Sequence, residues 1–333
     1  MSLPASLARK LRLPVVGAPL FVISNPSLVI AQCKAGIIGA FPALNARPAS
    51  QLDEWLHQIT EELASWNREH PDEPAAPFAV NQIVHKSNDR LEADLELCVK
   101  WKVPIVITSL GARTDVYDAV RRYGGFTLHD VIHNGFAHKA IDKGADGLIL
   151  VAAGAGGHAG TLSPFALIEE VREWFAGPVA LAGAIASGAS ILAAIAAGAD
   201  LAYIGSRFIA TSEANAPEAY KQMIVDSAAT DIVYTNLFTG VHGNYLRGSV
   251  VRAGLDPEAL PQSDPAKMNF GSGGNTARKV WRDVWGCGQG IGLIHDVRPA
   301  AEVVAGLTVE FEAARRRLES RLMTAAAPQS RIQ

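Results

Sequence analysis

The strongest constraint on the fold is a regular alternation of short apolar segments with longer helical patterns between residues 15 and 204. Such an alternation is typical of βα units that build a parallel sheet. The apolar segments predict strands over Val15–Ala18, Ile37–Ala40, Phe78–Ile83, Ile105–Ser109, Phe126–Leu128, Gly147–Val151, Val179–Leu181 and Leu201–Ile204. The helical patterns between them cover Ser27–Lys34, Ser50–Arg68, Asp89–Lys100, Thr114–Arg122, Gly135–Lys143, Pro164–Phe175 and Ala189–Ala197.

This succession of strands and helices predicts a (β/α)₈ barrel, the TIM-barrel fold of the α/β class. A doubly wound sheet usually has fewer strands and carries a GxGxxG motif after the first one. The first turn here, Gly17 to Leu20, reads Gly-Ala-Pro-Leu and lacks that motif. The active site is therefore expected at the carboxyl ends of the barrel strands.

The alternation stops near Thr211, which suggests a second subdomain. Residues 212–286 contain helical pieces, a polar stretch and aromatic residues, so we expect an inserted, mostly helical lid over the barrel mouth. Residues 299–323 predict one long amphipathic helix that closes the barrel. The barrel would then comprise residues 1–211 and 287–333.

Charge and composition exclude several classes of partner. Lys and Arg number 30 against 33 Asp and Glu, and no segment is strongly basic, so neither nucleic acid nor a membrane is expected as a partner. The three cysteines form no CxxC pair, which argues against a disulfide framework. The amino terminus lacks the apolar stretch of a signal peptide, so we expect a cytoplasmic enzyme. The uncharged stretch 177–199 is rich in Ala and Gly, and we interpret it as strand, turn and buried helix.

Two glycine-rich turns follow the seventh and eighth predicted strands. The first runs from Ala182 to Gly188 and contains Gly183, and the second begins with Gly205 and Ser206. In TIM barrels these two turns often bind phosphate, because glycine lets backbone N–H groups approach an anion. We expect a phosphate site there, although the same glycines could serve only to make tight turns.

His158 is the strongest candidate for catalysis. It lies within Ala153-Gly-Ala-Gly-Gly-His-Ala-Gly160, directly after the sixth predicted strand, where bare backbone lets a flat ligand approach. A histidine can accept or donate a proton near neutral pH. The alternative, a surface histidine without a role, is less favoured because this loop faces the same barrel mouth as the phosphate turns.

The runs GAGGHAG, LAGAIASG and AAGADLAYIGSRF together resemble the nitronate monooxygenase family, also called 2-nitropropane dioxygenases. The resemblance covers roughly residues 13–240 and extends to the segment 288–292. It implies a TIM barrel with a helical second domain, FMN as the cofactor, and oxidation of alkyl nitronates or nitroalkanes with O₂. Related quinone reductases and enoyl-acyl-carrier reductases share much of the pattern.

The resemblance also assigns roles to individual residues. His158 matches the proposed catalytic base, and no metal ligand is implied. The residues that it implies for cofactor binding lie in five places along the chain: Ala18, Pro19 and Leu20; Asn81; Gly156 and Gly157; Gly183, Gly205 and Ser206; Gln289 and Gly290.

The chain departs from the family pattern at the fifth strand. Many relatives carry a lysine near the flavin, where this chain has His129 and Asp130. A cation there would stabilise negative charge on a reduced flavin, and a protonated His129 could substitute for it.

Three functions therefore remain open on the sequence. The first is FMN-dependent oxidation of a nitronate or a nitroalkane. The second is an NAD(P)H-dependent quinone or enoyl-thioester reductase, for which Arg247 and Arg252 are the nearest cations. The third is a flavin-free lyase or isomerase that binds a sugar phosphate. The sequence does not fix the oligomeric state, and a homodimer is one assembly open to it.

Overall fold

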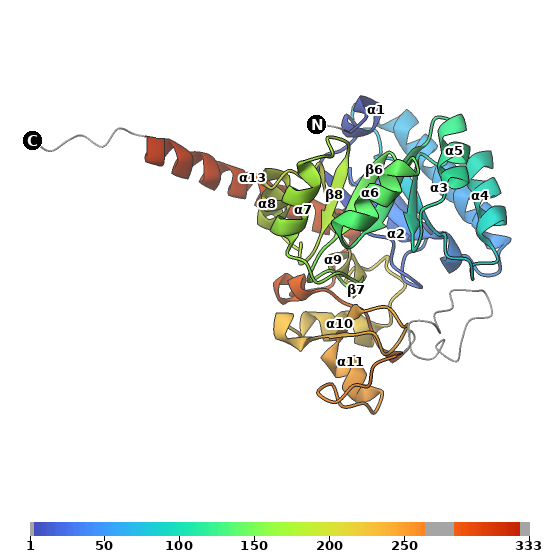
Figure 1. Ribbon diagram of the computed structural model, residues 1–333. Helices are drawn as coiled ribbons and strands as arrows, with labels where there is room; N and C mark the ends of the chain where they lie inside the picture. Colours follow the sequence, from blue (N-terminus) through green and yellow to red (C-terminus); the bar gives the residue numbers. More distant parts are fainter. Residues whose placement is uncertain (1–2, 264–282, 327–333) are drawn as a thin grey trace, which may run out of the picture.

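The computed structural model describes residues 3–263 and 283–326, and its centre is a closed barrel of eight parallel strands (Figure 1). Each strand pairs with the next along the chain, and β1 pairs with the last strand to close the ring. The barrel prediction is therefore confirmed. Its strands are β1 (Val15–Gly17), β2 (Ile38–Pro42), β3 (Phe78–Ile83), β4 (Ile105–Ser109), β5 (Phe126–Val131), β6 (Gly147–Val151), β8 (Val179–Ala182) and β9 (Leu201–Ile204).

Helices surround this barrel and connect its strands (Figure 1). The long α13 packs against α8 and α2, so it closes the outer ring as expected. The short α1 (Ala5–Ala8) precedes β1 and packs against the cluster inside the barrel through Leu7 and Ala8. The helices of the outer layer are α2 (Pro26–Lys34), η1 (Ala43–Asn45), α3 (Gln51–Glu69), α4 (Leu91–Lys100), α5 (Thr114–Arg122), α6 (Asn134–Asp142), α7 (Pro164–Arg172), α8 (Gly188–Ala196), α9 (Ser206–Ile209) and α13 (Ala300–Ala326).

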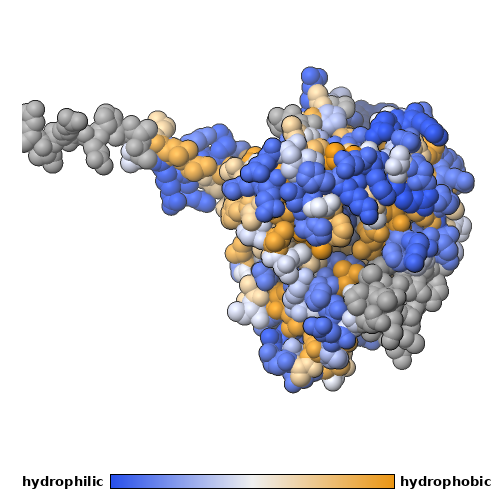
Figure 2. Space-filling view, in the orientation of Figure 1, coloured by the Kyte–Doolittle hydropathy of each residue, from blue (hydrophilic) through white to orange (hydrophobic). Residues whose placement is uncertain are grey.

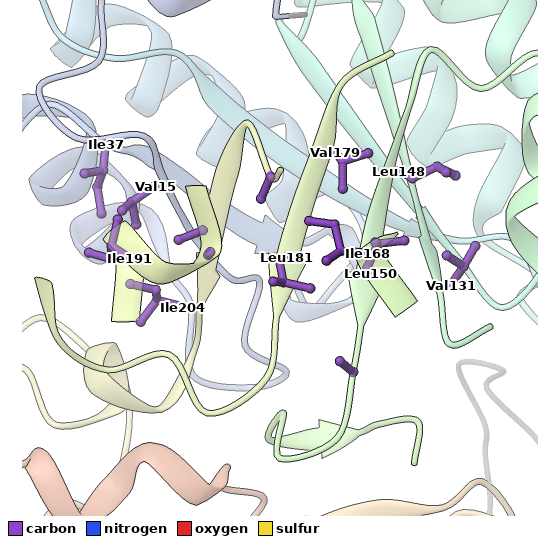
Figure 3. Close-up of a cluster of buried hydrophobic side chains, with 14 of the residues drawn as sticks. Val15, Ile37, Val131, Leu148, Leu150, Ile168, Val179, Leu181, Ile191 and Ile204 are labelled. Atoms are coloured by element: carbon purple, nitrogen blue, oxygen red, sulfur yellow. The ribbon is translucent and has the colours of Figure 1, made fainter. Parts of the chain in front are cut away.

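Alternate residues of each strand face opposite sides of the barrel wall. One set packs inside the barrel and includes Val16, Ile107 and Leu201. The other set faces the helices, as Leu181 and Leu150 do beside Ile168 of α7 (Figure 3). Both faces of the wall are buried, which explains why these strands appear in the sequence as nearly continuous apolar runs.

Helix α8 begins at a well-defined cap. The Ser187 side chain accepts a hydrogen bond from the backbone N–H of Ser190, and the Ser190 hydroxyl accepts one from the Ser187 N–H. This reciprocal capping satisfies two of the N–H groups that a helix start leaves free. Residues 177–199 thus form β8, a turn and α8, as predicted. Among the described residues, no helix is long and apolar enough to span a membrane.

The chain between the barrel and α13 contains both helices and strands. Strands β10 (Ile232–Thr235) and β11 (Gly243–Leu246) pair with β7 (Gly157–His158), a strand of the loop after β6. This small antiparallel sheet was not anticipated, because its strands are short and one of them lies within a glycine-rich loop. The helical pieces are α10 (Glu218–Val225), η2 (Ala229–Asp231), α11 (Arg247–Arg252) and η4 (Gln289–Leu293).

Helix α13 extends beyond the rest of the molecule at its carboxyl end (Figure 1). The part that leaves the body shows both hydrophilic and hydrophobic residues in the space-filling view (Figure 2). Leu318 and Leu322 there are 41% and 61% exposed, whereas Val304 and Leu307 near the start of the helix are buried.

Candidate active site

A large cavity opens at the carboxyl ends of the barrel strands, where the fold predicts the active site. Its volume is about 1770 Å³, and the chain after the barrel forms part of its wall through residues such as Tyr234 and Phe238. The predicted site residues that line it are Ala18, Pro19, Leu20, Asn81, Gly156, Gly157, His158, Gly183, Gly205, Ser206 and Gly290.

The floor of this cavity is the uppermost layer of the barrel interior. Each member follows an inward-facing residue of the same strand by two positions, so it points to the same side of the wall. Asn81 follows Ala79 in this way, and Asp130 follows Leu128. One floor residue comes from the end of each strand: Ala18, Pro42, Asn81, Ser109, Asp130, Val151, Ala182 and Tyr203.

Three neighbouring floor residues form a hydrogen-bonded chain, which we call the acid side: Asn81, Ser109 and Asp130. The Asn81 Nδ2 atom donates to Ser109 Oγ at 2.7 Å and to the Ile107 carbonyl oxygen at 3.3 Å. The Ser109 hydroxyl in turn donates to Asp130 Oδ2 at 2.5 Å. Because Asn81 occupies one lone pair of Ser109, the serine proton is directed at the carboxylate.

Burial gives Asp130 an unusual acidity. Its removal from water raises the pKa of the Asp130 carboxyl to about 6, and the hydrogen bond from Ser109 opposes that rise. Tyr203, on β9, is partly buried, and its removal from water, with a smaller contribution from the nearby Asp130, raises its pKa well above the usual range for a phenol. The tyrosine therefore stays neutral, while Asp130 changes charge close to physiological pH.

His129 does not supply the cation that the sequence left open. Its ring lies toward α5, where Nδ1 is 2.7 Å from Thr108 Oγ1 and 3.1 Å from the Tyr117 hydroxyl. Burial, with a smaller contribution from Lys143, lowers the pKa of His129 to about 4. The ring is uncharged near neutral pH, so a protonated His129 cannot replace the lysine of relatives there. Adjacent residues of a strand face opposite sides, and here Asp130 is the one that faces the cavity.

The segment between β9 and α13 holds His158 in place. Its strand β7 pairs with β11, and the Asn244 side chain of β11 donates to the Ala155 carbonyl oxygen at 2.6 Å. The ring atom Nε2 lies 2.9 Å from Thr239 Oγ1. Thr239 is 81 residues away in the chain, and sequence analysis missed it because nothing local connects it to the histidine loop.

The hydrogen bonds of Thr239 couple the tautomer of His158 to the direction of the Thr239 hydroxyl. The Thr239 hydroxyl has one proton, and its oxygen lies 3.0 Å from the Val241 carbonyl oxygen. When the hydroxyl donates to that carbonyl, Nε2 of His158 must donate to Thr239, and Nδ1 becomes the basic nitrogen. Burial lowers the pKa of His158 to about 4, so the ring is neutral at pH 7 and can accept a proton.

The opposite edge of the cavity is made from backbone, and we call it the glycine side: Gly183, Gly205 and Ser206. Gly183 has a φ of +135°, and a Cβ there would lie 2.7 Å from the Ala153 carbonyl oxygen. A Cβ on Gly205 would make ordinary contacts of 3.4 and 3.6 Å with Leu20 and Ala18. The end of β1 thus lies beside the turn after β9.

Two residues near the glycine side lie elsewhere than the sequence suggested. Gly188, in the turn that we assigned to phosphate, lies against α13, and its N–H donates to Glu310 Oε2 at 2.8 Å. The amino terminus of α8 thus already has an acidic partner. Gln289 lies just behind the cavity wall, where its N–H donates to the Gly154 carbonyl oxygen at 2.9 Å.

Three aromatic residues near the barrel mouth, and the two arginines that sequence analysis named as the nearest cations for NAD(P)H, differ in whether they line the cavity. Phe21 lines the cavity, whereas Phe41 is buried against Trp55 and Tyr245 against Phe238. Arg247 pairs with Glu258, and the Arg252 guanidinium lies 3.6 Å from the centre of the Trp285 ring. Both arginines therefore stabilise the second subdomain.

Comparisons with known proteins agree with this geometry. The model of a family described as nitronate monooxygenase matches residues 6–310. A nitronate monooxygenase of Paraburkholderia phytofirmans is 27% identical over 339 residues, which cover 90% of this chain and 92% of its own length.

Two further relatives bear on the fold and on the range of chemistry. A (3aS,4S,5R,7aS)-5-hydroxy-7a-methyl-1-oxo-octahydro-1H-indene-4-carboxyl-CoA dehydrogenase of Mycobacterium tuberculosis is 25% identical over 276 residues, covering 81% of this chain and 73% of its own. The structure of a nitroalkane oxidase from Streptomyces ansochromogenes superimposes with a TM-score of 0.78 at 24% identity, covering 94% of this chain and 100% of that one. The second likeness supports the fold.

Proposed function

Because this chain belongs to the nitronate monooxygenase family and is thus an oxidoreductase, we propose that it uses FMN to oxidise alkyl nitronates with O₂. The products would be a carbonyl compound and nitrite. The observation that supports this most is the cavity itself, which has a glycine side fit for phosphate and His158 on the facing loop. Family membership supports a flavin. In the cavity, the glycine side would bind the cofactor phosphate, and the acid side contains a carboxyl group that can exchange a proton.

The residues of the cavity fit FMN. Its phosphate would lie on the glycine side, where Gly183 and Gly205 leave the backbone open and Ser206 offers a hydroxyl. Its ring would lie beside Asn81 and the segment 18–20. We expect FMN and not FAD, because one phosphate cradle is present and the first turn lacks a dinucleotide motif. The bound flavin would accept the electrons of the substrate and pass them to O₂.

The chain's own residues would orient the substrate and move its proton. A nitronate is already an anion, but a neutral nitroalkane must first lose its α-proton. His158 is neutral, and Thr239 holds its Nε2. Its Nδ1 could therefore accept that proton. Asp130 is a second group that can exchange a proton at the same cavity.

A reductase or dehydrogenase acting on a larger substrate is the second candidate. The cavity volume of about 1770 Å³ exceeds the roughly 300–1,000 Å³ of a usual ligand pocket, and the cofactor would occupy part of it. The carboxyl-CoA dehydrogenase among the relatives makes a thioester a reasonable alternative. Against NAD(P)H, Arg247 and Arg252 are already engaged within the subdomain.

The test combines the cofactor with the products. The purified protein should be yellow, and mass spectrometry of the released cofactor should give FMN. With propane-2-nitronate and O₂ it should form acetone and nitrite at rates above the uncatalysed reaction. A colourless protein would support the flavin-free lyase or isomerase instead. A yellow protein that forms no nitrite but oxidises NADPH with a quinone or an enoyl thioester would support the second candidate.

A further inference from the structure

An ionisable carboxyl lies in the floor of a cavity that is proposed to bind an anion. Asp130 lines the cavity, and its Oδ2 is engaged by Ser109. An ionised carboxylate repels a nitronate, and the repulsion is strong where water is largely excluded. An ionised Asp130 therefore weakens the binding of an anion next to it.

We propose that Asp130 must carry a proton when the cavity binds an anionic substrate, so that anion binding and protonation of this carboxyl are coupled. This inference deepens the proposed function, because it states which ionic form of the site accepts a nitronate. It also assigns to Asp130 a role in choosing between charged and neutral substrates.

The hydrogen bonds of the acid side suit a carboxyl that is used in both forms. In the ionised form, Oδ2 accepts the Ser109 proton, which Asn81 directs toward it. In the protonated form, Oδ2 can still accept from Ser109 while Oδ1 carries the new proton. That proton can then be donated to an oxygen atom of the anion. Protonation therefore exchanges a repulsion for a hydrogen bond.

The other charged groups of the cavity do not reproduce this effect. Arg47 and Lys139 line the wall, and a cation there attracts an anion. Burial keeps Tyr203 neutral, and His158 gains charge only in stronger acid, since its pKa lies at about 4. Three further histidines, His85, His129 and His242, line the cavity, so the effect is assigned to Asp130 by comparing the wild type with a variant of that residue.

The substrate preference should therefore change with pH. Below pH 6 the carboxyl is mostly protonated, because its pKa is raised to about 6, and the cavity accepts an anion. Above pH 6 the carboxylate disfavours the anion and leaves a neutral substrate unaffected. At higher pH, Asp130 could also act as a base toward such a substrate.

The experiment measures binding of nitrate, a planar anion that does not titrate in this range, to the holoprotein as purified. Isothermal titration from pH 5 to 8.5, in two buffers of different ionisation enthalpy, gives both affinity and proton uptake. We expect affinity to fall about tenfold per pH unit above pH 6, with about one proton taken up on binding there. In Asp130→Asn, nitrate should still bind, but its affinity should no longer fall with pH and no proton should be taken up on binding.

Two matched variants complete the test. Asp142→Asn removes an exposed carboxyl from α6, outside the cavity, and should behave as the wild type does. Ser109→Ala removes the hydrogen bond that lowers the pKa of Asp130, so the affinity should begin to fall at a higher pH. This shift keeps the proposal testable even if Asp130→Asn impairs folding, which the melting temperature would reveal.

Three results would overturn the proposal: nitrate affinity that does not vary with pH, a slope that persists in Asp130→Asn, or no nitrate binding at pH 5. None of them depends on turnover. Failure of the coupling is therefore distinct from failure of the proposed function, which would appear as an absence of nitrite formed from a nitronate.

Discussion

The two sides of the cavity are built in different ways. The glycine side consists of backbone, and at Gly183 a single added carbon would collide with the Ala153 carbonyl oxygen. The acid side consists of side chains, which meet because three neighbouring strands end at the same level with Asn81, Ser109 and Asp130 facing inward. The glycine side thus provides a backbone surface without titratable groups. The acid side provides a carboxyl group that can carry a proton.

This difference separates binding of the cofactor from control of the substrate. Changes on the glycine side should lower cofactor content and stability at every pH. Changes at Ser109 and Asp130 of the acid side should alter the pH dependence of substrate binding and leave the cofactor in place. The following variants test that division, beginning with the largest expected effect.

The largest effect on rate is expected at His158. His158→Asn should lower kcat/KM for a neutral nitroalkane by about 10²- to 10⁴-fold, the usual contribution of a general base. A preformed nitronate has already lost its proton, so its kcat/KM should fall much less. The measurement is the ratio of the two constants at equal flavin content. An unchanged ratio would exclude His158 as the base.

If the wild-type enzyme accepts only nitronates, the ratio cannot be formed. The nitronate rate of His158→Asn then reports on substrate contact alone, and the base role loses its support. Asp130→Asn serves as the comparison, because it should change how the nitronate rate depends on pH, whereas His158→Asn should lower the nitroalkane rate at every pH.

Next in size is the effect of a methyl group on the glycine side. Gly183→Ala combines a φ of +135° with the contact to the Ala153 carbonyl oxygen. It should cost about 1–3 kcal/mol of stability and lower flavin occupancy. The matched control is Gly205→Ala, whose Cβ would meet Leu20 at an ordinary 3.4 Å. Melting temperature and the ratio of flavin to protein absorbance measure both. Equal losses in the two variants would contradict the steric account.

A smaller effect is expected at Thr239, which orients His158. Thr239→Val keeps the shape of the side chain and removes the hydrogen bond to Nε2. One such bond is worth about 0.5–1.5 kcal/mol, so we expect roughly a two- to twelve-fold loss in nitroalkane kcat/KM. Thr239→Ser retains the hydroxyl and should restore the rate. A serine variant as slow as the valine variant would count against the hydrogen bond as the cause.

The smallest effect concerns a helix end outside the cavity. Glu310 of α13 accepts the Gly188 N–H at the start of α8. Glu310→Gln should lower stability by about 0.3–1 kcal/mol, because a negative charge there favours the helix dipole. Flavin content and kcat/KM should not change. A loss of flavin in this variant would indicate that the amino terminus of α8 does contribute to phosphate binding.

The sequence predicted the parts of this molecule that depend on local patterns. The barrel strands were recognisable because both of their faces are buried, and the turns at Gly183 and Gly205 because glycine follows a strand there. The floor residues were harder to predict. Whether His129 or Asp130 faces inward depends on where β5 ends. That strand continues to Val131, beyond the predicted end at Leu128.

Contacts between distant segments could not be foreseen. The pairing of β7 with β11 and the contact of His158 with Thr239 join segments that share no local signal. The same holds for Gly188, whose position in a glycine-rich turn suggested phosphate but whose neighbour is α13. In each case the residue type was informative, and its partner was set by tertiary packing.

The most direct test of the account is the response of the flavin spectrum to substrate in the absence of O₂. The holoenzyme is titrated with propane-2-nitronate and, separately, with NADH and NADPH. The account predicts that the nitronate bleaches the flavin absorption, more readily at pH 5.5 than at pH 8, and that neither nicotinamide does so at a comparable rate. Rapid bleaching by NADH or NADPH, with no response to the nitronate at either pH, would contradict it.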